Sequence, residues 1–490
     1  MRVLADRSSN VPATEAHGGD SRSVAVVGAG ITGLVAAYEL RRRGVNVTLY
    51  ESSTQAGGTI RTTHAEGFLA EHGPNSFVSS APVEELLSKL DLHGDVVEAN
   101  PAANRRFVVR GGELLSFPLT PSAMLSTRLF SLRAKLRVLG EPLIARRDSA
   151  DEESIASFVR RRLGPEVLNY AVDPFISGIF AGDPEQLSMA HAFPRVAALE
   201  REHGSISKGL MANRRAAKLA RQQAATSTDV VAQQSPPAAR LISFVDGMQT
   251  LTDALGASLA GTVRLGCPVR LLHRTETRWE IEAGPDGATR AHAVDAVVMA
   301  TPAHVLAAME LPAGLRRDSA PVERVEYPPV STLTLGFLRR DVEHPLNGFG
   351  MLIPAAERRS LLGALFSSSL FPARAPEDHV TITCFVGGSR HPEIAREDSA
   401  TLVGHVLHDL RALLGVRGDP TFIKHVYWPR AIPQYTLGYQ TVKDAADATE
   451  TANPGLYLVG NYRNGVSIGD CIASGQQTAE RVAAYLTRAG

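Results

Sequence analysis

The strongest constraint on this chain is a glycine-rich turn between an apolar strand and a helix near its amino end. The sequence predicts a buried strand at Val24–Val27 and a helix at Leu34–Leu40, joined by a turn with glycines at Gly28, Gly30 and Gly33. The first glycine permits a tight turn, the second a close approach to a pyrophosphate, and the third close packing of helix on strand. The N–H groups at the helix start can bind phosphate. This turn therefore predicts a bound dinucleotide.

The residues that follow the turn indicate which dinucleotide is bound. Val45–Tyr50 supply a second strand, and Glu51 follows at the distance of about twenty residues at which a carboxylate accepts ribose hydroxyls. An acidic side chain there disfavours the extra phosphate of NADP. Gly57 and Gly58 allow a second close backbone approach, and Arg61 places a cation near the phosphates. We therefore expect FAD.

Composition excludes several classes of site and partner. The 490 residues include 51 basic and 51 acidic side chains, so no nucleic acid or other acidic polymer is implied as a partner. Cys267, Cys384 and Cys471 are scattered, which fits a reducing compartment and predicts neither disulfides nor a metal site. Residues 1–22 are polar and are expected to be a disordered leader rather than a secretory signal.

The nucleotide-binding unit is not completed by its first segment. Asp295–Pro302 and Leu456–Asn461 each predict another buried strand closing on a turn, and Ile468–Tyr485 predicts a final helix. Val263–Leu272 and Trp279–Ala283 are expected to be short strands of a small sheet. We therefore expect a discontinuous FAD-binding domain built from residues 23–88, 240–310 and 449–490.

Two insertions are expected between these segments. Residues 106–220 predict a helical domain, in which Met124–Ile144 interleaves leucines with arginines. Such a basic amphipathic helix can lie at a bilayer surface, although periodicity alone slightly favours packing against a neighbouring domain. Residues 221–239 are expected to be a mobile loop. Residues 89–105 and 311–448 predict a mixed-sheet substrate domain with short strands.

The predicted fold class is therefore α/β. It combines a Rossmann-like FAD-binding domain with an inserted mixed-sheet substrate domain and an inserted helical membrane-associating domain.

The chain also resembles a known family. The glycine-rich turn, Glu51, the Gly57–Arg61 string and the late Gly460–Asn461 segment resemble the flavin-containing amine oxidase and phytoene desaturase superfamily. More specific strings resemble the protoporphyrinogen oxidases within it, and the resemblance runs from about Val24 to Leu486. These strings are His72–Phe77, Ser177–Pro184, Gly348–Pro354, Phe385–Arg390 and Ile432–Gly438.

The resemblance implies an FAD oxidoreductase of haem biosynthesis. It would convert protoporphyrinogen IX to protoporphyrin IX on a non-covalent FAD, with oxygen as acceptor and hydrogen peroxide as product. Such a reaction needs orientation more than a strong base, and no catalytic acid or base is assigned. The basic amphipathic stretch, together with the hydrophobic substrate, predicts a cytoplasmic enzyme attached peripherally to the inner face of the cell membrane; a homodimer is left open.

The resemblance assigns substrate roles to five residues. Arg106 matches the position that faces a substrate propionate, and its guanidinium fork suits a carboxylate, although adjacent Arg105 is left open as the true partner. Leu352 and Phe385 match positions that sandwich a pyrrole ring. Leu365 matches another wall of the cavity, and Gly178 a close backbone approach to the reacting edge.

The cofactor residues come partly from the turn and partly from the resemblance. The resemblance places Val269 at the adenine, Trp428 by the isoalloxazine, and the final helix start at the pyrimidine side of the ring, where its positive end favours the reduced anion. The full predicted set is Gly28, Ala29, Gly30, Ile31, Thr32, Gly33, Glu51, Ser52, Gly57, Gly58, Thr59, Arg61, Gly73, Pro74, Asn75, Ser76, Val269, Trp428, Gly460, Val466, Ser467 and Ile468.

Two alternatives stay open on sequence grounds. A related flavoenzyme would oxidise coproporphyrinogen III to coproporphyrin III, whose substrate carries more carboxylates and calls for more cations. An FAD-free partner-binding protein of the GTPase dissociation-inhibitor type uses the same scaffold, but the complete phosphate turn, Glu51 and Arg61 argue against it.

Overall fold

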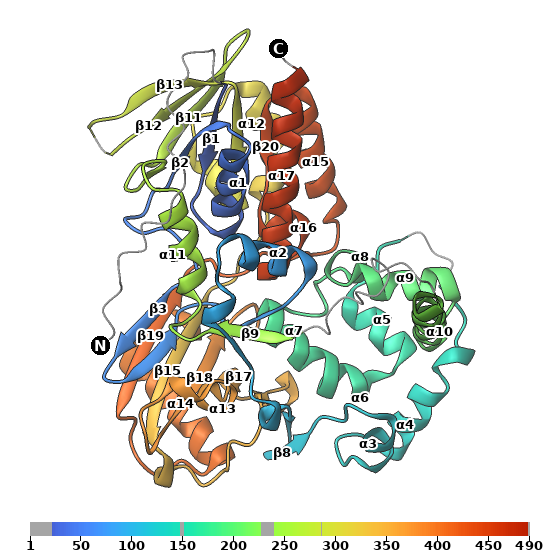
Figure 1. Ribbon diagram of the computed structural model, residues 1–490. Helices are drawn as coiled ribbons and strands as arrows, with labels where there is room; N and C mark the ends of the chain where they lie inside the picture. Colours follow the sequence, from blue (N-terminus) through green and yellow to red (C-terminus); the bar gives the residue numbers. More distant parts are fainter. Residues whose placement is uncertain (1–21, 148–150, 227–239, 286, 489–490) are drawn as a thin grey trace.

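The described residues form three parts that meet at the centre of the molecule (Figure 1). The computed structural model describes residues 22–147, 151–226, 240–285 and 287–488. The expected leader, apart from Arg22, and the expected loop from residue 227 onward lie outside these ranges. Figure 1 shows a nucleotide-binding part at the top, a large sheet at the lower left and a helical part at the right.

A parallel sheet forms the centre of the nucleotide-binding part. Its strand order is β10-β2-β1-β14-β20, and every neighbouring pair is parallel. Three separate stretches of the chain contribute strands, as expected, which confirms the α/β class. The strands are β1 (Ser23–Val27), β2 (Asn46–Tyr50), β10 (Val263–Arg264), β14 (Ala296–Met299) and β20 (Leu456–Leu458).

Both faces of this sheet are buried, because residues alternate along each strand. On β1, Val24 and Val26 face a core that contains α1 (Ile31–Arg42) and α17 (Ile468–Arg488). Ala25 and Val27 face the other core. The second core includes residues of β11 (Val269–Arg274), β12 (Trp279–Ala283), β13 (Arg290–Val294), α12 (Ala313–Glu323) and α15 (Gln440–Ala452).

One prediction about these strands is wrong. Val263–Leu272 does not lie wholly in a small sheet, because β10 pairs with β2 in the parallel sheet. Only the later residues, as β11, join the three-stranded sheet β11-β12-β13. Turn glycine Gly266, at a φ of +62°, lies between the two strands and lets the chain change sheets.

The part expected to bind substrate contains a seven-stranded sheet in the order β19-β15-β18-β17-β16-β7-β8. Only the β16–β7 pair is parallel. Helix α14 (Ser399–Leu414) shares a buried core with one face of this sheet. The strands are β7 (Arg106–Arg110), β8 (Glu113–Ser116), β15 (Val330–Leu338), β16 (Gly350–Leu352), β17 (Leu361–Leu365), β18 (His379–Gly387) and β19 (Phe422–Trp428).

The expected start of the helical domain at Arg106 is therefore wrong. Strands β7 and β8 belong to the seven-stranded sheet, since β7 pairs with β16 from a distant part of the chain. Helices begin only after them. They are α3 (Pro121–Ser126), α4 (Leu132–Leu139), α5 (Ile155–Arg162), α6 (Pro165–Val167), α7 (Asp173–Phe180), α8 (Met189–Ala192), α9 (Pro194–His203) and α10 (Ile206–Thr226).

Two further predictions in the helical part need correction. Met124–Ile144 is not one amphipathic helix, because α3 ends at Ser126 and the hydroxyl of Ser131 caps a new helix by accepting the N–H of Ala134 at 3.2 Å. The expected loop from residue 221 begins later, since α10 continues to Thr226. Among the described helices, none is both long and apolar enough to cross a bilayer.

A buried ion-pair cluster holds the helical part together. The Arg162 side chain is 0% exposed and pairs with Glu141 at 3.1 Å and Glu200 at 2.5 Å. Burial pushes the pKa of Glu200 upward, but hydrogen bonds from Arg161 and Arg162 outweigh it and lower that pKa to about 2. Arg162 of α5 and Glu200 of α9 carry opposite charges and are both buried, so separating the two helices would leave an unpaired buried charge.

Smaller sheets connect the parts. Strands β3 (Thr62–Ala65) and β4 (Phe68–Glu71) form a hairpin, and β9 (Leu241–Phe244) lies between β5 (Phe77–Val78) and β6 (Val96–Glu98). Helices α2 (Ala81–Lys89) and α11 (Gln249–Ser258) complete the nucleotide-binding part.

Replacing Gly33 by alanine should separate α1 from the turn after β1. A Cβ at position 33 would lie 1.9 Å from the carbonyl oxygen of Gly28, a backbone atom that cannot move freely. We expect Gly33→Ala to lower the free energy of unfolding by about 2–3 kcal/mol, measured by urea denaturation.

A matched control is Gly256→Ala in α11, where a Cβ meets nothing within 4 Å. It should be neutral or stabilise the fold by up to about 1 kcal/mol, since alanine is the better helix former. Equal unfolding midpoints for the two variants would contradict this account of the turn.

Candidate functional site

Three turns from distant parts of the chain meet at one edge of the parallel sheet. A Cβ on Gly28, after β1, would lie 2.8 Å from the carbonyl oxygen of Ala300, after β14. A Cβ on Gly460, after β20, would lie 3.6 Å from the carbonyl oxygen of Thr301. This edge is where the carboxyl ends of parallel strands meet, and ligands of open α/β sheets bind there.

Glu51 is held against the first turn. One carboxylate oxygen accepts the N–H of Ala29 at 2.7 Å, and the other accepts the N–H of Ser53 at 2.9 Å and the hydroxyl of Ser52 at 3.4 Å. The Glu51 carbonyl accepts the N–H of Cys267 at 2.8 Å, two residues before Val269. The structure therefore brings the predicted ribose and adenine residues to one place.

The second glycine pair packs onto the first. Gly57 donates its N–H to the carbonyl of Ala29 at 2.8 Å, and a Cβ on Gly58 would lie 3.3 Å from the Cα of Gly30. Both residues have positive φ, +109° and +61°, which favours glycine. The predicted phosphate-binding backbone is thus one continuous surface, with Ile31, Thr32 and Gly33 in the first turn of α1.

Arg61 is suited to an anionic ligand at this surface. Its Nε is buried and has no hydrogen-bond partner among the described residues. Buried guanidinium N–H groups normally donate a hydrogen bond, so this unused donor fits the pyrophosphate of a dinucleotide.

The loop at Gly73 links the nucleotide-binding part to the seven-stranded sheet. A Cβ on Gly73 would lie 2.4 Å from the carbonyl oxygen of Thr59. Trp428, at the end of β19, donates its Nε1–H to the carbonyl of His72 at 2.8 Å. The predicted cofactor residues Thr59, Gly73 and Trp428 therefore lie together. Asn75 donates to the Gly73 carbonyl at 3.2 Å within the same loop, which also contains Pro74 and Ser76.

His72 is uncharged at neutral pH. Burial, with the nearby charges of Lys424 and Arg61, lowers the pKa of its imidazole to about 4. A hydrogen bond of 2.7 Å joins its Nε2 to the hydroxyl oxygen of Thr63. The ring is a fixed part of this loop rather than a cation for phosphate.

The last helix begins at the same edge. The Ser467 hydroxyl donates to the Asp470 carboxylate at 2.6 Å and accepts the N–H of Asp470 at 3.1 Å. This reciprocal cap fixes the start of α17 between Val466 and Ile468. The positive end of the helix dipole therefore lies in the segment that follows β20.

Four predicted substrate residues share one face of the seven-stranded sheet. Gly350 pairs with both Arg106 and Leu365, while Leu352 pairs with Gly363, which in turn pairs with Phe385. Their neighbours Met351 and Cys384 lie in the core that contains α14. Because side chains alternate across a sheet, Arg106, Leu352, Leu365 and Phe385 face away from α14, and the three apolar ones are half-buried.

Gly178 approaches this face from the helical part. A Cβ at position 178 on α7 would lie 2.9 Å from a methyl group of Leu352. Arg106 is exposed at the start of β7, and its guanidinium carbon lies 5.5 Å from the centre of the Phe349 ring. Arg105 lies before the strand and is also exposed. The register favours Arg106 as the cation on the Leu352 face.

Sequence reasoning missed the contact that holds α7 in place. Arg390 donates to both carboxylate oxygens of Asp173, at 2.8 and 3.0 Å, and to the hydroxyl of Ser177 at 2.7 Å. Arg390 and Ser177 stand in two of the strings noted above, but nothing in one sequence shows that they pair.

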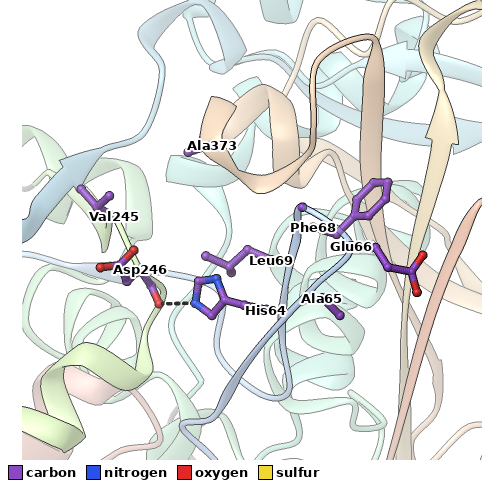
Figure 2. A pocket seen from close by; sticks show the side chains of 9 residues that line it. His64, Ala65, Glu66, Phe68, Leu69, Val245, Asp246 and Ala373 are labelled. Atoms are coloured by element: carbon purple, nitrogen blue, oxygen red, sulfur yellow. Dashed lines mark hydrogen bonds between the residues drawn. The ribbon is translucent and has the colours of Figure 1, made fainter. Parts of the chain in front are cut away.

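Two pockets of the described structure lie away from the predicted site residues. Figure 2 shows one of about 370 Å³, lined by the β3–β4 hairpin and by Val245, Asp246 and Ala373. There His64 contacts the carbonyl of Asp246 through Nε2 at 3.0 Å. Another, of about 390 Å³, includes Asp173 and Asp183. Neither includes a predicted site residue, and the described residues contain no cluster of histidine, cysteine and carboxylate groups suited to a metal ion.

Known proteins are similar in sequence to this chain over nearly its whole length. Protoporphyrinogen oxidase, mitochondrial, of Nicotiana tabacum is 35% identical over 489 residues, which cover 95% of this chain and 95% of the tobacco protein. Coproporphyrinogen III oxidase of Bacillus subtilis (strain 168) is 28% identical and covers 95% of this chain and 98% of its own length.

The fold has also been seen in a crystal. A structure from Exiguobacterium sp. 255-15 superposes with a TM-score of 0.78 at 24% identity, over 96% of this chain and 100% of that one. The family model described as flavin containing amine oxidoreductase matches residues 31–483. Together with the tobacco relative, this match shows that the chain is a flavin-dependent oxidoreductase of the flavin-containing amine oxidoreductase family.

Proposed function

We propose that this protein oxidises protoporphyrinogen IX to protoporphyrin IX in haem biosynthesis, using non-covalent FAD and passing the electrons to oxygen. The observation that carries the proposal is the face formed by Leu352, Leu365 and Phe385 with the exposed cation Arg106 at its edge. A flat, apolar macrocycle with propionate groups needs such a surface. Relatives named protoporphyrinogen oxidase support the same substrate.

The chain's own residues bind and orient in this mechanism. The glycine turns, Glu51 and Arg61 would hold FAD, which when bound would supply an acceptor for a hydride equivalent from a methylene bridge and a route for the electron pair to oxygen, giving hydrogen peroxide. Arg106 binds a propionate through its planar fork. The apolar face excludes water, and Gly178 lets α7 approach without a side chain. No side chain is required as acid or base, since orientation supplies the main effect.

Cys471 supports non-covalent binding. Its thiol lies in α17 next to the predicted flavin segment, 4.0 Å from the carbonyl oxygen of Gly465. Burial raises the pKa of the Cys471 thiol to about 11, so it is not a thiolate at neutral pH and is a poor nucleophile toward a flavin ring.

Protoporphyrinogen IX added under anaerobic conditions should bleach the flavin absorbance, and air should restore it. The expected product is protoporphyrin IX, followed by its fluorescence. Coproporphyrinogen III serves as the comparison, because bacterial relatives carry that activity in their names. Faster bleaching by coproporphyrinogen III would favour the second candidate, and bleaching by neither would refute both.

The arginine variants refine this experiment. Arg106→Met should raise the KM for protoporphyrinogen about tenfold or more, the loss expected for one charge-assisted hydrogen bond. Arg105→Met is the matched control and should keep the KM of the unmodified protein. The reverse pattern would identify Arg105 as the propionate partner.

We further propose that α3, α4 and the turn after them attach the protein peripherally to the inner face of the cell membrane. Leu136 is 59% exposed and Leu143 90% exposed, and Leu125, Leu132 and Leu139 are exposed with them. Exposed Arg128 and Arg133 lie in the same stretch. Clustered apolar side chains flanked by arginines are typical of interfacial segments. Figure 1 places α3 and α4 at the outer edge of the helical part.

Vesicle flotation tests this attachment. The protein should float with vesicles of phosphatidylcholine and phosphatidylglycerol at moderate salt, and the double variant Leu136→Gln, Leu139→Gln should float markedly less. Ile423→Gln, at a 46% exposed residue of β19, is the control and should float like the parent. Equal flotation of all three proteins would place the membrane contact elsewhere, and no flotation would refute it.

A further inference from the structure

The Tyr435 side chain joins both ends of the segment that precedes α17. Its hydroxyl donates to the carbonyl of Asn461 and accepts the N–H of Gly465 at 3.1 Å. The residue is only 4% exposed, so water does not readily replace either bond. A single hydroxyl group therefore closes the turn between β20 and α17.

Other contacts also hold this segment, among them the ion pairs of Arg463 with Asp447 and Glu450 and the buried ring of Tyr462, but the Tyr435 hydroxyl is bonded near both of its ends. Gly460 and Gly465 have φ angles of +137° and +128°, and only the single turn α16 (Asn461–Asn464) lies between them. Glycines allow this path but do not enforce it, since they are free to adopt many others. In Figure 1, α16 lies at the end of α17 that faces the other two parts.

A second tyrosine supports the first. Tyr439, 2% exposed, donates its hydroxyl to the carbonyl of Tyr462 within α16 at 2.6 Å. The rings of Tyr435 and Tyr439 lie 4.7 Å apart. The two hydroxyls thus hold three backbone groups of the segment Gly460–Ser467.

The residues around Tyr435 are themselves fixed to the helical part. The Tyr435 carbonyl accepts the N–H of Ser188 at 2.8 Å. The side chain of its neighbour Gln434 donates to the carbonyl of Phe180, the last residue of α7, at 2.8 Å. The backbone that carries the Tyr435 side chain is therefore anchored to the helical part by these two hydrogen bonds.

We propose that Tyr435, supported by Tyr439, is a positioning residue that fixes the segment Gly460–Ser467 and thereby holds the positive end of α17 toward the flavin. The inference rests on membership in the flavin family and not on the identity of the substrate. It assigns no chemical step to either tyrosine.

Loss of the Tyr435 hydroxyl should weaken the stabilisation of negative charge on the flavin. Removing it leaves the Gly465 N–H and the Asn461 carbonyl without this partner, and the segment relaxes toward other partners. The start of α17 then moves or becomes mobile, and its dipole stabilises negative charge on the flavin less well. The reduced, anionic flavin is destabilised more than the oxidised one.

The test uses the flavin-loaded protein and sulfite, an anion that adds to oxidised flavins and leaves them negatively charged. Tyr435→Phe should raise the dissociation constant for sulfite about threefold or more, the range of a helix-dipole effect, and should lower the flavin midpoint potential. Tyr457→Phe is the matched control, because that buried hydroxyl donates to the carbonyl of Arg481 near the far end of α17, at 3.4 Å. It should leave both values unchanged.

Hydrogen exchange provides a readout that does not depend on flavin chemistry. Peptides covering 460–467 should exchange faster in Tyr435→Phe than in the parent, and those of the control should not. Tyr439→Phe should change exchange and sulfite binding in the same direction, by less; it decides the question if Tyr435→Phe does not fold. Unchanged sulfite affinity and exchange in the folded tyrosine variants would overturn the proposal. Because neither measurement uses a porphyrinogen, the result stands apart from the substrate assignment.

Discussion

The close approach of glycine backbones at the carboxyl edge of the parallel sheet is the constraint on which the rest of the structure depends. Gly33 packs against the carbonyl of Gly28, and the Gly57–Gly58 pair packs against Ala29 and Gly30. Any side chain at Gly33 would push α1 away and open the surface that meets the phosphates. Arg61, three residues after Gly58, has a buried and unused Nε donor, which suits an anionic ligand. Flavin binding is therefore a property of backbone geometry first and of side chains second.

The substrate face depends on a different principle, the alternation of side chains across a sheet. Leu352, Leu365 and Phe385 come from three adjacent strands and share a face only because the strand register aligns them. A slip of one residue in β16 would exchange Leu352 for Met351 and bury the wrong side chain against α14. Arg106 reaches this face from a strand more than two hundred residues away in the chain, through its pairing with Gly350.

The sequence alone predicted the elements whose signals are local, and failed where long-range pairing decides. The glycine turn, Glu51 and the strand at Asp295–Pro302 follow from periodicity and spacing, and the structure has them. The predicted domain boundary at Arg106 was wrong, because the amino acids at 106–116 give no local signal that β7 pairs with the distant strand β16. The site roles of Leu352 and Phe385 came from resemblance, since an apolar residue on a short strand looks like any core residue. The Arg390–Asp173 pair joins residues 217 positions apart and was not predicted at all.

Hydride transfer between two bound rings requires that the parts holding them keep a fixed distance, and here those parts come from different regions of the chain. The segment Ile432–Gly438 is one of the places where they are joined, beside the contact between Trp428 and His72. Gln434 bonds to the end of α7, whose Gly178 approaches Leu352, while adjacent Tyr435 bonds to the segment ahead of α17. Neighbouring residues on one extended segment cannot move far apart. Gln434 and Tyr435 therefore attach the end of α7 and the segment ahead of α17 to the same short stretch of backbone.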